Sequence, residues 1–131
     1  ARAKANLVLA ENSGTIDLIQ RLDRAFDNST TADFFARILV EFGDNSTIRP
    51  VYANFHEHLR QLIASELTLE TGVEGRRTYL AAASILAMMV GVHAEQRLES
   101  ARLTRSDFRE MLIEVTRLVL CDLGKPVGTG P

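Results

Sequence analysis

The residues best suited to metal chemistry lie next to one another, at His56, Glu57 and His58. Two histidines on a helix can share one metal ion when they are four residues apart, because they then lie on the same face. His56 and His58 are two residues apart, so on a helix their imidazoles point about 200° away from each other. The sequence therefore predicts no metal site.

Side chains that could act as nucleophiles are few. Neither Ser84 nor Cys121 has a base nearby in the sequence, and there is no glycine-rich loop of the kind that binds phosphate groups. Most acidic residues occupy helix-cap or i, i+4 positions, which explains them without catalysis. We therefore expect neither an enzyme nor a bound cofactor.

Aromatic and flexible side chains on three predicted helices could instead hold a small ligand. Helical bundles bind small apolar molecules with such side chains and a few polar groups that fix the ligand's orientation. The candidate ligand-binding residues are Phe34, Phe35, Ile38, Tyr52, Phe55, His56, Leu59, Met89 and His93. We expect them to line a pocket for an apolar or aromatic effector, although an ordinary packed core would have the same composition.

Helical periodicity supplies the elements that would position these side chains. Apolar residues recur at a spacing of about 3.6 residues, and no stretch has the β-branched alternation of a sheet. Thr104 and Asp107 carry the start signal of the last helix. The predicted helices cover about residues 1–11, 14–26, 30–43, 47–68, 77–97 and 104–124. The sequence therefore predicts an all-α fold, a helical bundle of about six helices that forms one domain over residues 1–131.

The helix predicted at residues 77–97 is apolar on all sides. From Leu80 to Val92 only Ser84 and Gly91 are not apolar. Such a helix must be covered all round, and its apolar run is shorter than the roughly 20 residues of a membrane span. We expect a second copy of the chain to cover part of it, although the central helix of a monomeric bundle would look the same.

The last predicted helix also has more apolar surface than one bundle needs. Its main apolar positions are Phe108, Met111, Leu112, Val115, Leu118 and Val119, and we expect Ile113 and Leu120, seven residues apart, to form a second apolar flank. This flank again favours a homodimer.

Charge and cysteine content limit the partners and the compartment. The chain has 15 Lys and Arg residues against 17 Asp and Glu residues, and they are interspersed, so we expect no DNA binding by this chain itself. The single cysteine, Cys121, excludes an internal disulfide and fits a reducing compartment. There is neither a secretory leader nor a long apolar run, so we expect a cytoplasmic protein with no membrane partner.

The order of these helices, and the stretch from Leu80 to Leu120 above all, resembles the C-terminal part of TetR-like bacterial transcriptional regulators. Those chains end with an Ala- and Leu-rich helix that contains a glycine, a short polar loop and a capped last helix. Gly91, Leu103, Thr104 and Phe108 occupy the matching positions. The family's N-terminal helix-turn-helix is absent from this chain. The resemblance implies an effector-binding and dimerisation domain that controls DNA binding by that missing part.

In that family the last two helices of each subunit form a four-helix dimer interface, and the preceding helices enclose the effector. Carried over to this sequence, the resemblance implies the interface residues Ala81, Ser84, Met88, Gly91, Glu95, Ile113, Thr116, Arg117 and Leu120. It also implies a homodimer that responds to an effector, but it does not indicate which one. The small, mostly apolar character that we expect of the effector comes from the candidate ligand-binding residues themselves. The alternative from a different functional class is a helical protein–protein interaction module with no ligand.

Overall fold

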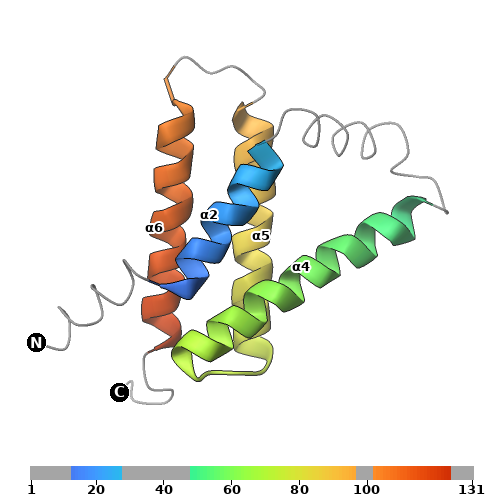
Figure 1. Cartoon of the computed structure of the whole chain (residues 1–131), viewed down its shortest axis with the longest axis vertical. Coiled ribbons are helices and arrows are strands. Elements are labelled where there is room, and N and C mark those ends of the chain that lie inside the picture. The colour runs from blue at the N-terminus through green and yellow to red at the C-terminus, as the bar shows by residue number, and fades with distance from the viewer. Residues whose placement is uncertain (1–12, 28–47, 97–101, 125–131) are drawn as a thin grey trace, which may run out of the picture.

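The computed structural model describes residues 13–27, 48–96 and 102–124. These residues form four helices, α2 (Gly14–Asp27), α4 (Ile48–Thr71), α5 (Arg76–Gln96) and α6 (Arg105–Leu123), and within them there is no strand (Figure 1). The all-α class is therefore confirmed for this part of the chain. The helices predicted at residues 1–11 and 30–43 lie outside the described residues, and so do Phe34, Phe35 and Ile38 of the predicted pocket.

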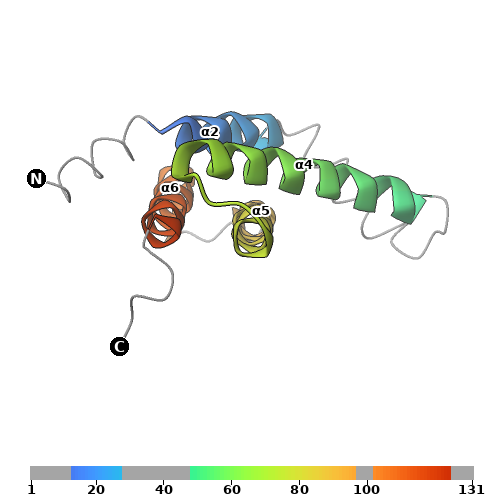
Figure 2. The same ribbon diagram turned by 90° about the horizontal axis from the view of Figure 1, so that it is seen from below.

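The four helices form two layers. α5 and α6 lie side by side and run in opposite directions, while α2 and α4 lie together over one side of that pair (Figures 1 and 2). α4 crosses α5 obliquely and contacts it with its C-terminal half (Figure 1). The other side of the α5–α6 pair is not covered by any described residue (Figure 2).

The hydrophobic core fills the space between the two layers. Each helix contributes residues that recur three or four positions apart, which places them on one inward face. The fully buried apolar side chains are Ile19, Ile63, Leu67, Ile85, Leu86, Met89, Leu112 and Leu123. Burying each such side chain contributes roughly 1.5–3 kcal/mol, so this cluster is the main source of stability among the described residues.

The start of α6 agrees with its sequence signals. The Asp107 backbone N–H donates to Oγ1 of Thr104 at 3.1 Å, and the Thr104 N–H donates to the Asp107 carboxylate at 2.7 Å. These two bonds make the reciprocal capping box, which satisfies backbone donors that the first turn of a helix leaves free.

The start of α2 is capped by two residues, one of them distant in sequence. Ser13 Oγ accepts a hydrogen bond from the Ile16 N–H at 3.0 Å. The Glu70 carboxylate, near the end of α4, accepts hydrogen bonds from Ser13 Oγ at 2.6 Å and from the Thr15 N–H at 2.9 Å. A carboxylate is favourable at the positive end of a helix dipole. Glu70 therefore ties the end of α4 to the start of α2.

The α4–α5 connection is shorter than the sequence predicts. α4 continues to Thr71, whereas the periodicity indicated an end near Thr68. Gly72 and Gly75 have φ angles of 75° and 100°, values that glycine adopts at low cost. The hydroxyls of Thr68 and Thr78 both donate to the Val73 carbonyl at 2.9 Å, so the short loop is held by both helices.

α5 is the one helix in the described ranges that is long and apolar enough to cross a membrane by length and composition alone. It has 21 residues, and its most apolar window has a mean hydropathy of 1.3. Only 33% of that window is buried inside the fold. The sequence prediction that this helix is too short to cross a membrane was based on the apolar run from Leu80 to Val92 alone. The helix itself extends beyond both ends of that run. A core helix meets the same criterion, so this property does not indicate a membrane by itself.

Candidate functional site

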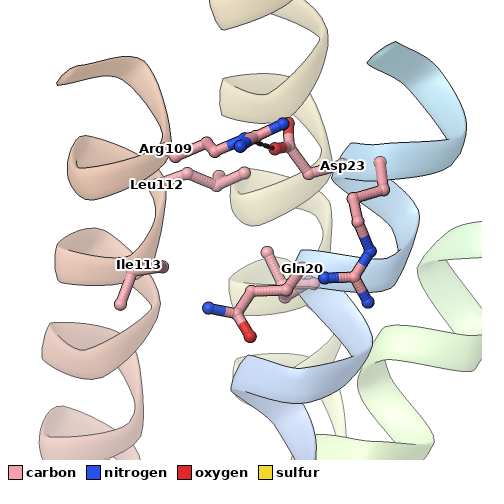
Figure 3. A pocket seen from close by; sticks show the side chains of 7 residues that line it. Gln20, Asp23, Arg109, Leu112 and Ile113 are labelled. Carbon is pink, nitrogen blue, oxygen red and sulfur yellow. Dashed lines mark ion pairs between the residues drawn. The ribbon is translucent and has the colours of Figure 1, made fainter. Parts of the chain in front are cut away.

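A buried carboxylate joins three of the helices. Asp23, on α2, is only 5% exposed. Its Oδ1 atom lies 2.9 Å from Nε2 of His93 on α5, and its Oδ2 atom lies 3.5 Å from Nε of Arg109 on α6. Figure 3 shows the side chains of Asp23 and Arg109 directed toward each other between α2 and α6. We call Asp23, His93 and Arg109 the charged cluster.

The place of Asp23 in α2 explains its burial. Ile16, Ile19 and Phe26 recur with Asp23 at spacings of three and four residues, so Asp23 lies on the inward stripe of the helix. Burying a carboxylate is costly unless it is paired and hydrogen-bonded. His93 supplies one partner, and its ring is in turn packed 5.9 Å from the ring of Phe26. Sequence reasoning missed Asp23, although a carboxylate within an apolar stripe was a usable signal.

A small pocket lies beside the charged cluster, between α2 and α6. Its volume is about 140 Å³. One wall is apolar, and the remaining lining groups are an amide, a carboxylate and two guanidiniums. The lining residues are Ile19, Gln20, Asp23, Arg24, Arg109, Leu112 and Ile113. Figure 3 shows Leu112 and Ile113 projecting from α6 and Gln20 from α2. We call this space the α2–α6 pocket.

The α2–α6 pocket has groups suited to binding. None of its seven lining residues is a Ser, Thr, Cys, Lys or Tyr that could act as a covalent nucleophile. Each oxygen of the Asp23 carboxylate already faces a nitrogen partner. Within the part of the chain that the structure describes, no group of three His, Cys, Asp or Glu side chains could hold a metal ion. The lining itself presents guanidinium and amide donors beside an apolar wall.

Three members of the predicted ligand-binding set lie together on the N-terminal half of α4. The ring of His56 lies 4.4 Å from the ring of Tyr52 and 6.3 Å from the ring of Phe55. Tyr52 and His56 are half-buried, whereas Phe55 is 40% exposed. We call these three residues the aromatic cluster. Phe34, Phe35 and Ile38, expected opposite it, are among the residues not described.

Burial shifts the pKa values of the two titratable side chains of the aromatic cluster. It lowers the pKa of His56, and the nearby Arg60 guanidinium lowers it further, while burial raises the pKa of Tyr52. At neutral pH the His56 ring is therefore uncharged and keeps one donor and one acceptor nitrogen. Its Nε2 atom is buried and has no hydrogen-bond partner among the described residues. The cluster thus offers an apolar surface with an unused polar atom.

The other three described members of the predicted set lie elsewhere. Leu59 and Met89 are buried in the core between the layers, and His93 belongs to the charged cluster. None of the three lines the α2–α6 pocket. The structure therefore brings together Tyr52, Phe55 and His56, whereas His93 contacts Asp23 in the charged cluster.

An open groove of about 600 Å³ runs between the C-terminal half of α4 and the start of α5. Tyr79 lines it, and its hydroxyl donates to the Glu57 carboxylate at 2.5 Å and 3.0 Å. This hydrogen bond lowers the pKa of Glu57 and raises that of Tyr79. Glu57 also pairs with Arg60 on its own helix at 3.0 Å. The central residue of the His-Glu-His run is therefore a structural link between α4 and α5.

The residues predicted for the α5 side of the dimer interface lie at or near the surface. Ser84, Gly91 and Glu95 are exposed, and Ala81 and Met88 are half-buried. A methyl group built at Gly91 would meet nothing within 4 Å.

The α6 side of the predicted interface is placed differently. Thr116 and Leu120 are buried in the chain's own core, and Thr116 Oγ1 donates to the Leu112 carbonyl at 2.8 Å. Ile113 lines the α2–α6 pocket. Half-buried Arg117 pairs with Glu114 at 2.8 Å. These four residues are therefore engaged within one subunit.

The buried side of α6 agrees with the sequence prediction at Phe108 and Leu112 but differs from it at three other positions. Leu120 was expected on an outer flank but is buried, whereas Met111 and Leu118 were expected in the core and are 40% and 60% exposed. Apolar residues cover more than half of this helix's circumference, so the pattern alone does not identify the inward side. The buried stripe that packing selects is Phe108, Leu112, Thr116, Leu120 and Leu123.

One surface remains open on the side of the α5–α6 pair that faces away from α2 and α4 (Figure 2). Helical spacing places exposed Leu80, Ser84, Ala87 and Gly91 of α5, and exposed Met111 and Leu118 of α6, roughly opposite the buried stripes of their helices, so they are members of this surface. The contact of Arg77 with Asp122, at 3.1 Å, crosses between the two helices near one end. We call this surface the outer face.

No family model, no curated protein and no solved structure matches this chain.

Proposed function

We propose that this chain is the dimerisation and effector-binding domain of a TetR-like transcriptional regulator, and that two copies pair through the outer face. The observation that carries the proposal is the uncharged, exposed stripe of α5. Leu80, Ser84, Ala87 and Gly91 follow one another at spacings of four, three and four residues, so they share one side of the helix. No Asp, Glu, Lys or Arg occurs between Arg77 and Glu95.

The residue types of this stripe suit a close approach of helices. Surface helices of monomeric proteins usually have charged side chains on the side that faces water. The exposed side of α5 has small residues, which allow a second backbone to come near, and Met111 and Leu118 extend the apolar surface onto α6. Exposed apolar surface of this kind marks interaction sites.

The size of the outer face is compatible with a dimer. α5 has 21 residues, which corresponds to a length of about 30 Å, and the axes of packed helices lie about 8–10 Å apart. A face two helices wide therefore covers on the order of 500 Å² in projection, and its accessible area is larger. A stable interface buries about 800 Å² of accessible surface on each partner. The outer face thus provides a large part of that area.

The oligomeric state tests this proposal. Sedimentation of the chain at micromolar concentration should give the mass of a dimer. Gly91→Glu would place a carboxylate within the two-fold contact and should give a folded monomer, because an unpaired buried charge is costly. Ala53→Glu, at an exposed position of α4, is the matched control and should remain a dimer. A monomeric parent chain, or equal behaviour of the two variants, would refute the dimer.

The aromatic cluster supports the effector-binding half of the proposal. His56 offers a buried Nε2 atom without a hydrogen-bond partner among the described residues, beside the rings of Tyr52 and Phe55, as a site for an aromatic molecule with a hydrogen-bonding group requires. A fluorescence titration with 2-naphthol tests this half. Phe55→Ala and Tyr52→Phe should weaken binding while the sedimenting mass stays that of the parent. Unchanged affinity in both variants would remove the aromatic cluster from the proposal.

A ligand-free interaction module is the second candidate, and a separate observation favours it. Val51, Phe55, Leu62 and Leu69 are all exposed on α4 at spacings of four, seven and seven residues, which puts them on one side of that helix. A row of large exposed apolar side chains suits the packing of a partner helix. Native mass spectrometry separates the candidates, because it reports the oligomeric mass and any retained small molecule together.

A further inference from the structure

The α2–α6 pocket differs in chemistry from the aromatic cluster. The aromatic cluster contains no Arg or Lys, whereas the α2–α6 pocket is lined by Arg24 and Arg109. Asp23 is the only acidic residue among its lining residues, so the formal charge of the lining is +1. Gln20 adds an amide that can donate hydrogen bonds. A ligand with a single negative charge would therefore find complementary groups here.

The size of the pocket limits the ligand. An engineered apolar cavity of about 150 Å³ accommodates a benzene molecule. The α2–α6 pocket has about 140 Å³, and Ile19, Leu112 and Ile113 form its apolar wall. We propose that this pocket binds a small monocarboxylate whose apolar or aromatic body is about the size of benzene.

The partners of the charged cluster favour a carboxylate over an amine. An ammonium group would need the Asp23 carboxylate, but His93 and Arg109 already contact its two oxygens. Arg24, in contrast, has no ion-pair partner among the residues that the structure describes. A guanidinium binds a carboxylate through two parallel hydrogen bonds, which a neutral alcohol does not allow. Arg24 at the rim therefore provides the selectivity for an anion.

This inference does not depend on the proposed dimer, because the lining residues belong to α2 and α6 of one subunit. The α2–α6 pocket and the outer face use different sides of α6. Ile113 lines the former and Met111 belongs to the latter, and residues two apart on a helix point about 200° away from each other.

The experiment is a calorimetric titration of the 131-residue chain with benzoate at pH 7. Benzyl alcohol and benzylamine serve as neutral and cationic probes of nearly the same size. Benzoate should bind at least about tenfold more tightly than either probe, because hydrogen bonds between charged groups are stronger than neutral ones. In an amide-resolved NMR titration, benzoate should shift the resonances of Gln20, Arg24 and Ile113.

Two variants test whether benzoate binds in the α2–α6 pocket. Arg24→Gln should weaken benzoate binding about tenfold or more, since it removes the charged partner at the rim. Arg21→Gln is the matched control, because Arg21 lies one turn earlier on α2, pairs with Asp17 at 3.0 Å and does not line the pocket. Its affinity for benzoate should equal that of the parent.

A third variant tests the location by filling the space. Gln20→Trp places a large ring at the pocket, so benzoate binding should be lost while circular dichroism still reports a helical fold. Equal affinity for benzoate and benzyl alcohol, equal weakening by Arg21→Gln and Arg24→Gln, or unchanged benzoate binding in Gln20→Trp would each overturn the inference.

Discussion

The substitution Gly91→Ala separates a solvent-exposed outer face from one that is covered by a second subunit. A methyl group at this position meets nothing within 4 Å inside one subunit, so it adds no strain to the monomer. Alanine is favoured over glycine inside a helix by roughly 0.5–1 kcal/mol. The isolated subunit should therefore become more stable, with a melting temperature higher by about 2–6 °C.

The same methyl group has the opposite effect in a close two-fold contact. Inserting a methyl group into a well-packed interface costs about 1–3 kcal/mol, and a symmetric dimer contains two copies, so the cost is about 2–6 kcal/mol per dimer. The dissociation constant should rise by a factor of at least about thirty.

The assay pairs sedimentation over a range of concentrations with thermal unfolding at a concentration low enough to populate monomers. The expected signature is a more stable monomer and a weaker dimer in the same variant. A variant that is stabilised and dimerises as strongly as the parent would show that Gly91 lies outside the contact. A destabilised monomer would show that the added methyl group at position 91 meets other atoms within one subunit, which would contradict the open space around Gly91.

Three further predictions follow from the described contacts. Ile63→Ala removes a fully buried side chain and should lower the free energy of unfolding by about 2–5 kcal/mol in urea titrations. Asp23→Ala leaves His93 without its carboxylate partner and should cost about 1.5–3 kcal/mol by the same measurement, with a smaller loss arguing against the charged cluster. Tyr79→Phe tests pH dependence: because the hydrogen bond lowers the pKa of Glu57 from its ordinary value of 4.5, its stabilisation is present above 4.5 and is lost as the pH falls from there through the lowered pKa of the folded state. In urea titrations Tyr79→Phe should therefore be less stable than the parent at pH 7, and the difference should shrink as the pH falls below 4.5, whereas a constant difference would contradict this assignment.

Local signals in the sequence were sufficient to predict the described helices. Each of these signals depends on residues that are close together in the sequence, so it can be recognised without knowledge of the tertiary structure. Examples are the capping box of Thr104 and Asp107 and the apolar spacing of Ile16, Ile19 and Phe26. The cap that Glu70 provides for α2 was not predictable in this way, because its donor lies 55 residues earlier in the chain.

The inward side of α6 required knowledge of its neighbours. Apolar residues at Met111, Ile113, Leu118 and Leu120 point in several directions, and the helix rotates to the side that packs best against α2 and α5. Packing chose a stripe that includes Thr116, a polar residue whose hydroxyl is satisfied by its own helix. A sequence pattern ranks residues by hydrophobicity and therefore excluded Thr116 from the core.

Two polar residues on inward stripes have different consequences for how the helices are arranged. Thr116 bonds to a carbonyl four residues earlier, so it is satisfied wherever α6 lies. Asp23 is satisfied only when His93 and Arg109, from two other helices, are both in place. An apolar core tolerates sliding of a helix, but a buried carboxylate without its partners is strongly unfavourable.

The charged cluster therefore constrains α2 in both position and rotation against the α5–α6 pair. Gln20 and Arg24 lie within one turn of Asp23 on the same helix, so the constraint on Asp23 also fixes their distance from Ile113 on α6. A pocket between two helices that were held by apolar contacts alone would vary in width. The buried carboxylate gives the α2–α6 pocket a defined width, which recognition of one small molecule by shape requires.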